Sequence, residues 1–501
     1  MKSPSFTDTK VYRVYEKLDD GEKKKFQAFL RSPYFNTSRK LVAYWEKFER
    51  FGHKKKGDKS LVAFYRKLHP ERVPDQVLSP AQEKSIQNKV RKLNAEIWPL
   101  LQEFIGLETY QGKPLLKQTH MFEGIQAREP KGGFEEFNFH ALEEKVAGAK
   151  VTHYQLNLLH QQWASRIALQ HTQRNQPLAE DFEKAVSTLD ESYFTQRVLY
   201  EMEQLMLGKK FEQKLDVKPM DVLIPYFEDQ VLHYNPLARG GYYLYQASRE
   251  PGNPAHLENL LNLIEQYQSD LEEPSIRNLA TGALNLLISL ANVQEEVYLP
   301  KLQDGYQKML KKKWILIDGK LEVRHFNNLI TALLRAGKVS EAHTFNQNWK
   351  DRLLSDAEEL AQLFNQGKIT LAQGKAEKAQ SLFRKLFQKL EKEHDFLFDI
   401  HVRLLLIRTN YQTKDWDSLD LNLANFLPFM NNRAHYPELH KASALKYLKV
   451  VGKLSTISQS VSVTPQSLSA LEDLVKKEPR PVMKAWLLEE IHKLRGGPHQ
   501  G

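Results

Sequence analysis

Apolar residues recur every three or four positions along most of this chain, a spacing typical of amphipathic α-helices. The longest run follows Ser79-Pro80, and its apolar residues are alternately four and three apart: Ile86, Val90, Leu93, Ile97, Leu100 and Phe104. Serine, proline and Gln82 at the start of the run form the capping-box pattern of a helix N-terminus. The pattern predicts one long helix with a buried seam and a kink at Pro99.

The same spacing predicts four shorter helices before this one. The second should begin at Asp19, which can form a capping box with Glu22, and should end at Ser32-Pro33. The apolar faces of the four helices are Val11, Val14, Tyr15 and Leu18; Phe26, Phe29 and Leu30; Leu41, Tyr44, Trp45 and Phe48; and Leu61, Phe64 and Leu68.

Helix breakers are scarce. The chain has 23 glycines and 22 prolines in 501 residues, whereas an average chain of this length would have about 60 in total, and this deficit favours helices.

One segment, 314–323, does not have a helical pattern, because Asp318-Gly319 separates two apolar runs as in a β-hairpin. We expect an ordered loop there with at most a small ribbon. The predicted fold is all-α, an N-terminal helical bundle followed by an α-solenoid array of helical repeats.

Proline- and glycine-containing stretches at 111–114 and 129–133 predict a linker or domain edge. Long helices are expected at 151–170 and 178–207, and a helical hairpin at 235–267. We therefore predict a basic N-terminal helical domain (1–112), a middle helical-hairpin region (113–295), a C-terminal repeat region (296–495) and a disordered tail (496–501).

The chain has no cysteine. This excludes disulfides, thiolate metal sites and a cysteine nucleophile. The N-terminus lacks the apolar core of a signal peptide, and no apolar run approaches the roughly 18 residues of a membrane span. We expect a soluble cytoplasmic protein that does not bind membranes.

The net charge of +10 is concentrated at one end. Residues 1–120 hold 25 lysines and arginines against 14 acidic residues, whereas the remainder holds 47 against 48. A basic domain can attract nucleic acid, anionic lipid or an acidic protein. A solvated lysine-rich helical surface explains the same excess with fewer assumptions, and we prefer it.

Three similar turns recur in the last third of the chain, at Gly337, Gly374 and Lys414, which are 37 and 40 residues apart. Gly367 stands seven residues before the second turn, and Ala379 and Phe383 follow it. This spacing resembles the tetratricopeptide repeat, in which small residues let two antiparallel helices approach and an aromatic residue fills the groove to the next unit. The resemblance covers about residues 323–430.

The repeats depart from that motif in two of the three units. Ile330 and Ile407 stand where the first glycine would be, and Lys414 replaces the glycine of the turn. The spacing also exceeds the usual 34 residues or so. We therefore expect degenerate, lengthened relatives of the tetratricopeptide repeat.

Three short segments resemble a family of uncharacterised bacterial proteins of similar length. Residues 24–36 (KKFQAFLRSPYFN) resemble its opening, and residues 325–330 (HFNNLI) and 403–407 (RLLLI) resemble later landmarks. The resemblance implies the same helical architecture and a bacterial cytosolic origin. It implies no chemistry.

In tetratricopeptide arrays the first helix of each unit lines a concave groove that binds peptides. The groove positions correspond here to seven residues: Arg324, Asn327, Arg335, Phe364, Lys368, Arg408 and Tyr411. This mostly basic and amide set would suit an acidic peptide or a chain-terminal carboxylate. The competing interpretation, which the degeneracy of the repeats favours, is that these positions are solvated or covered by neighbouring helices.

No motif indicates catalysis, a cofactor or a metal. Gly240-Gly241 is a lone glycine pair, for which a turn or close helix packing is the better explanation. His153 and His160 are seven residues apart, whereas zinc-binding helices space histidines four apart. A second group lies where we expect a solvated turn between repeats: His394, Asp395, Asp399 and His401.

We therefore expect a non-enzymatic scaffold or adaptor that binds a protein or an acidic peptide, without cofactors. The alternative is a nucleic-acid-associated factor that uses residues 1–120. An enzyme with scattered catalytic groups is a third hypothesis. The sequence leaves the partner and the oligomeric state open.

Overall fold

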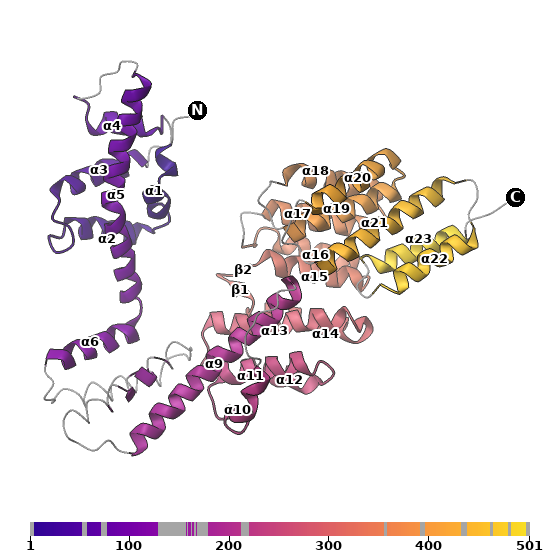
Figure 1. The fold of residues 1–501 in the computed structure, drawn as a ribbon, viewed down its shortest axis with the longest axis horizontal. Helices are drawn as coiled ribbons and strands as arrows, with labels where there is room; N and C mark the ends of the chain where they lie inside the picture. Colours follow the sequence, from indigo (N-terminus) through magenta and orange to yellow (C-terminus); the bar gives the residue numbers. More distant parts are fainter. Residues whose placement is uncertain are drawn as a thin grey trace. The chain divides into compact units, whose positions relative to one another are not determined.

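The computed structural model describes residues 5–52, 58–71, 78–128, 179–211, 220–354, 358–390, 396–431, 438–460, 464–478 and 482–496, with isolated positions between 157 and 167. Apart from one two-stranded ribbon, the regular structure of these residues is helical, and the chain is all-α. It divides into two compact units, Met1–Ala147 and Gly148–Gly501 (Figure 1). The predicted boundaries at 112/113 and 295/296 stay predictions.

Three predicted features lie outside the described residues: the linker at 129–133, most of the helix at 151–170, and residues 497–501 of the tail.

The first unit contains the predicted N-terminal helices. Its elements are η1 (Phe6–Asp8), α1 (Lys10–Tyr15), α2 (Asp20–Arg31), α3 (Arg39–Gly52), α4 (Leu61–Leu68), α5 (Pro80–Gln111) and α6 (Pro114–Arg128). The capping box of α2 is present, because the Glu22 amide donates to Asp19 Oδ1 at 2.8 Å and the Asp19 amide donates to Glu22 Oε2 at 2.9 Å. The same arrangement joins Ser79 and Gln82 at the start of α5.

α5 forms the spine of the core of this unit. It continues through Pro99, and its buried seam runs to Phe104 as predicted, except that Leu101 is buried in place of Leu100. α1, α2, α3 and α4 each pack on α5. The core that they enclose is rich in aromatic residues, such as Phe26, Trp45, Phe48 and Phe64.

In the described part of the second unit, a long helix, α9, is followed by a series of helices (Figure 1). Its elements are α9 (Ala179–Phe211), η2 (Met220–Val222), α10 (Ile224–Val231), α11 (Pro236–Arg249), α12 (Pro254–Tyr267), α13 (Glu273–Ala291), α14 (Glu295–Lys311), β1 (Leu316–Ile317), β2 (Lys320–Leu321), α15 (Val323–Arg335), α16 (Val339–Trp349), α17 (Glu358–Ala372), α18 (Ala376–Lys389), α19 (Phe396–Gln412), α20 (Trp416–Asn431), α21 (Glu438–Gln459), α22 (Pro465–Lys476) and α23 (Lys484–Gly496).

From α11 to α20 each helix packs on the next one in sequence. This includes α14 and α15, although the ribbon lies between them in the sequence. One hydrophobic core runs from Phe194 to Ile369 and so includes residues on both sides of position 295. A second cluster joins α17, α18 and α19, and a third joins α19, α20 and α21 to α22 and α23.

The glycine pair of α11 allows close helix packing, which is one of the two explanations that the sequence left open. A Cβ at Gly240 would lie 2.7 Å from Leu279 Cδ1, and one at Gly241 would lie 2.7 Å from Val198 Cγ1. α11 can therefore approach both α13 and α9 closely only because these two side chains are absent. The predicted ribbon also exists: Leu316 pairs with Leu321, and Asp318 and Gly319 both have positive φ, as a tight hairpin turn requires.

The three repeat turns share one hydrogen-bonding pattern. Gly337, Gly374 and Lys414 have φ values of 72°, 77° and 56°. In each case the amide of the following residue donates to the carbonyl five residues back, at 2.9, 3.2 and 2.9 Å. This is the Schellman ending of a helix, which needs a left-handed residue at that position. The lysine in the third turn therefore adopts the backbone conformation that glycine adopts in the other two.

Candidate partner-binding groove

The packing that the repeat resemblance implied is present in the second hairpin, α17–α18. Gly367 of α17 faces Phe383 of α18, and both Ala379 and Phe383 are fully buried. The first helices of this unit and the preceding one, α15 and α17, also pack on each other. These two helices carry five of the seven predicted binding residues.

Lys368 lies on this α15–α17 face. Its Nζ donates to Thr331 Oγ1 of α15 at 2.6 Å and to Asn365 Oδ1 of α17 at 3.3 Å. The ammonium also lies 4.9 Å from the centre of the Phe364 ring. In the described part of the chain no carboxylate pairs with it. Burial lowers the pKa of Lys368 to about 7, because removing an ammonium from water disfavours its charged form.

The two acceptors around Lys368 are themselves fixed by hydrogen bonds. Asn365 is fully buried and donates to Asn327 Oδ1 at 2.6 Å and to the Ala361 carbonyl at 3.0 Å. Thr331 Oγ1 donates to the Asn327 carbonyl at 2.6 Å. An ammonium has three N–H donors, and the described residues accept two of them. Hydrogen bonds within the described residues therefore leave one donor of Lys368 unused.

Two predicted residues at the ends of α15 bind within the chain instead. Arg324 is exposed and pairs with Glu322 at 2.7 Å. Arg335 donates to Asn292 Oδ1, Glu295 Oε1 and the Ala291 carbonyl, at 2.8 to 2.9 Å. It therefore fixes the connection between α13 and α14, and most of its donors are occupied.

Arg408 and Tyr411 of α19 lie against the C-terminal helices. The Arg408 guanidinium lies 5.1 Å from the centre of the Trp486 ring. The Tyr411 hydroxyl lies 2.9 Å from Ser458 Oγ of α21. Burial lowers the pKa of Arg408 and raises that of Tyr411. The groove positions of the third unit are thus covered by α21 and α23.

The structure therefore brings Asn327, Phe364 and Lys368 together at one site and places the other four elsewhere. The sequence prediction missed Thr331 and Asn365, which hold the ammonium. A signal for both existed: Thr331 is four residues after Asn327, and Asn365 is three before Lys368, so each pair shares a helix face.

No group of three or more potential metal ligands occurs among the described residues. His160 Nδ1 lies 3.1 Å from the Ala185 carbonyl. His153, His394 and Asp395 lie outside the described residues, and Asp399 pairs with Arg403 at 2.9 Å. Of the described helices, none has the length and apolar content that crossing a bilayer requires.

In the basic N-terminal unit most aromatic residues that could stack on bases are in the core. Tyr44, Trp45 and Tyr65 are buried, whereas Tyr34 is 86% exposed. Several cations have partners inside the unit: Lys25 pairs with Glu108, Arg31 with Glu46, and Lys10 lies over Trp98.

Comparison with known proteins adds little to this picture. No protein-family model matches the chain, and no solved structure matches it. The chain is similar to the thioredoxin domain-containing protein 9 homolog of Arabidopsis thaliana, with 29% identity over 100 residues. The match covers 20% of this chain and 47% of that protein, so the chain spans less than half the length of this curated relative.

Proposed function

We propose that the chain is a non-enzymatic helical-repeat scaffold whose α15–α17 face binds an acidic segment of a partner protein. Lys368 carries this proposal, because it is a cation held by two neutral acceptors with no carboxylate partner in the described residues. A partner carboxylate would supply the opposite charge through a charge-assisted hydrogen bond. The succession of hairpins from α11 to α20 fits an α-solenoid, an architecture that commonly presents such grooves.

The position of Lys368 favours binding in a second way. Its desolvation is already a cost of the folded state, so pairing with a ligand does not require this ammonium to lose much further water. Its rotamer is also fixed by Thr331 and Asn365. Binding of a carboxylate requires the protonated amine. Above pH 7 binding should therefore take up a proton and weaken by up to about tenfold per pH unit.

The first test is capture of partners by the tagged full-length protein from native lysate, in parallel with and without nuclease. A defined protein partner that survives nuclease supports the scaffold. Loss of every partner with nuclease contradicts it.

The second test compares Lys368→Met with Lys378→Met in binding to that partner. Lys378 is an exposed lysine on α18, in the same hairpin but on the other helix. We expect Lys368→Met to weaken binding by about tenfold or more, equivalent to roughly 1.4 kcal/mol, and Lys378→Met to leave it unchanged. Equal affinities for the two variants would remove this face as the binding site.

The alternative function is nucleic-acid binding through residues 1–120, which hold the whole basic excess of the chain. The salt dependence of binding distinguishes nucleic-acid binding from protein binding. Contacts to phosphates release counterions, so affinity for nucleic acid falls steeply as ionic strength rises.

A dithiol redox function is inconsistent with this sequence, because thioredoxin-type exchange uses paired cysteines and the chain has none. The bacterial origin and the cytoplasmic location stay predictions.

A further inference from the structure

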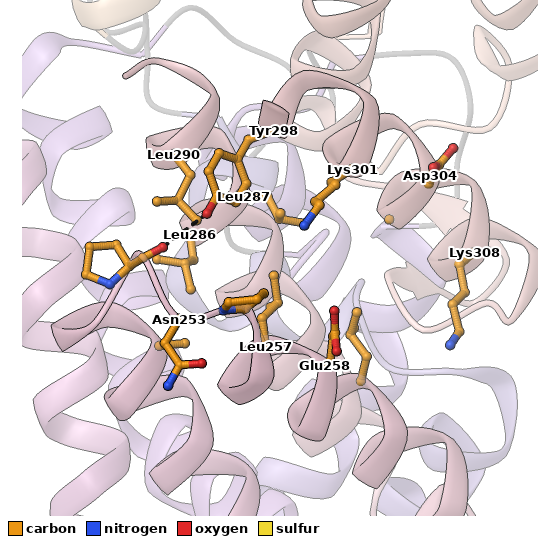
Figure 2. A pocket seen from close by; sticks show the side chains of 15 residues that line it. Asn253, Leu257, Glu258, Leu286, Leu287, Leu290, Tyr298, Lys301, Asp304 and Lys308 are labelled. Carbon is orange, nitrogen blue, oxygen red and sulfur yellow. Dashed lines mark hydrogen bonds between the residues drawn. The ribbon is translucent and has the colours of Figure 1, made fainter. Parts of the chain in front are cut away.

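A hollow of about 290 Å³ lies between α12 and α14 in the second unit. Its lining is mostly apolar and includes five leucines: Leu257, Leu261, Leu286, Leu287 and Leu290. Four of them, all except Leu261, are labelled in Figure 2. This volume is near the lower end of the range for small-molecule sites, which starts at about 300 Å³. The hollow is separate from the face around Lys368, since none of its lining residues belongs to α15 or α17.

Two features keep the hollow open. Gly305 of α14 has no side chain, and a Cβ there would lie 3.3 Å from Leu287 Cδ1. At one end the Tyr298 hydroxyl donates to the Pro251 carbonyl at 3.2 Å, which ties α14 to the turn before α12. The positions of the five lining leucines are therefore fixed by the packing of α12, α13 and α14.

Opposite charges flank the opening. Lys301 comes from α14 and Glu258 from α12, so they stand on opposite walls (Figure 2). In the described part of the chain neither side chain forms an ion pair. The other lysine of the lining differs, because Lys308 pairs with Glu265 at 2.8 Å. Asp304 is directed away from the opening in Figure 2.

We propose that this hollow binds a small zwitterion with an apolar side chain, that is, a free apolar α-amino acid. Its carboxylate would pair with Lys301, its ammonium with Glu258, and its side chain would cover the leucines. A fatty acid would place its carboxylate opposite Glu258, and an alkylamine would place its cation opposite Lys301, so each satisfies one wall and opposes the other. An amino acid satisfies both.

The test is calorimetric titration of the full-length protein with L-leucine and L-phenylalanine. Two analogues keep the leucine side chain but only one charge: 4-methylpentanoic acid and 3-methylbutylamine. We expect saturable binding of the amino acids, and binding of each analogue weaker by about tenfold or more, equivalent to roughly 1.4 kcal/mol. No binding of either amino acid up to its solubility limit overturns the proposal. Equal binding of the analogues overturns the assignment of the two charges.

Variants locate the site. Lys301→Met and Glu258→Gln should each weaken L-leucine binding by about tenfold. Both side chains are exposed, so neither substitution should change stability by much. The control is Lys311→Met, because Lys311 is an exposed lysine of α14 outside the lining. This variant should bind L-leucine as the unaltered protein does. If Lys301→Met and Lys311→Met bind equally, the amino acid binds elsewhere and the proposal fails.

Discussion

Gly367 of α17 lies directly against the ring of Phe383 of α18, and a Cβ at Gly367 would come within 2.5 Å of Phe383 Cε1. The phenylalanine is fully buried and cannot move out of the way without disturbing Leu386 and the helices around it. Contact between these two helices therefore depends on the absence of one side chain.

Gly367→Ala should lower the free energy of unfolding by about 1–3 kcal/mol, the usual effect of overpacking a core. Gly452→Ala is the matched control, because Gly452 lies within α21 and its added Cβ would have its nearest neighbour at 3.8 Å. There the better helix propensity of alanine should add up to about 1 kcal/mol. Urea unfolding of the two variants measures whether each substitution raises or lowers the free energy of unfolding. A Gly367→Ala protein as stable as Gly452→Ala would contradict the close packing.

The repeat turns predict a pair of opposite effects. Gly374→Ala places a Cβ at φ 77° and should destabilise the protein by about 1–2 kcal/mol. Lys414→Gly removes a side chain from the same backbone conformation, at φ 56°, and should stabilise it by up to about 1 kcal/mol. The midpoints of thermal unfolding should move in opposite directions. Movement in the same direction would mean that the turns are not equivalent.

The local part of the fold could be predicted because its causes are local. The capping boxes at Asp19 and Ser79 and the hairpin turn at Asp318-Gly319 each depend on side chains within a few residues. The equivalence of the turn at Lys414 to the glycine turns also followed from spacing, although lysine seldom adopts positive φ.

The candidate groove could be predicted only in part, because its outcome depends on distant segments. Arg408 and Tyr411 occupy the expected positions of α19, yet α21 and α23 cover them, and Trp486 is 75 residues or more from both. The spacing of residues within one repeat does not predict which later helix will pack over its groove. The contact between Lys368 and Thr331 also joins two helices, whereas Asn365, three residues before Lys368 on the same helix, could have been found from spacing.

His325 should make the protein sensitive to mild acid. It is buried, with Nε2 3.3 Å from Thr281 Oγ1 and Nδ1 3.4 Å from the Tyr306 hydroxyl. Burial, aided by Arg324, lowers its pKa to about 4, although the Glu322 carboxylate at 3.6 Å acts in the opposite direction. The unfolded state therefore binds more protons between pH 6.5 and 4, and stability falls as the pH falls through this window.

The measurement is the change in unfolding free energy between pH 7 and pH 4.5 for the unaltered protein and for His325→Asn. The variant has a packing defect at both pH values, so only the change with pH is compared. We expect the loss on acidification to be smaller in the variant, by up to about 1.4 kcal/mol per pH unit. An equal loss in both proteins would show that His325 does not titrate as described.

Lys368 should give a pH dependence of the same sign as His325, but in the alkaline range. Its pKa in the folded protein is about 7, well below the ordinary lysine value of 10.5. Between these two pH values the unfolded state binds more protons than the folded state, so stability rises as the pH rises from 7 to 10.5. One group contributes at most about 1.4 kcal/mol per pH unit to this slope, and below pH 7 the contribution is constant.

Lys368→Met removes this titration, so its unfolding free energy should rise less between pH 7 and pH 10 than that of the unaltered protein. Lys378→Met, which changes an exposed lysine of the same hairpin, should keep the full slope. A bound acidic partner should also remove the slope, because it raises the pKa of Lys368 towards its ordinary value. If the three proteins show the same slope without a partner, Lys368 is solvated, and the charge that the α15–α17 face offers a ligand is an ordinary surface charge.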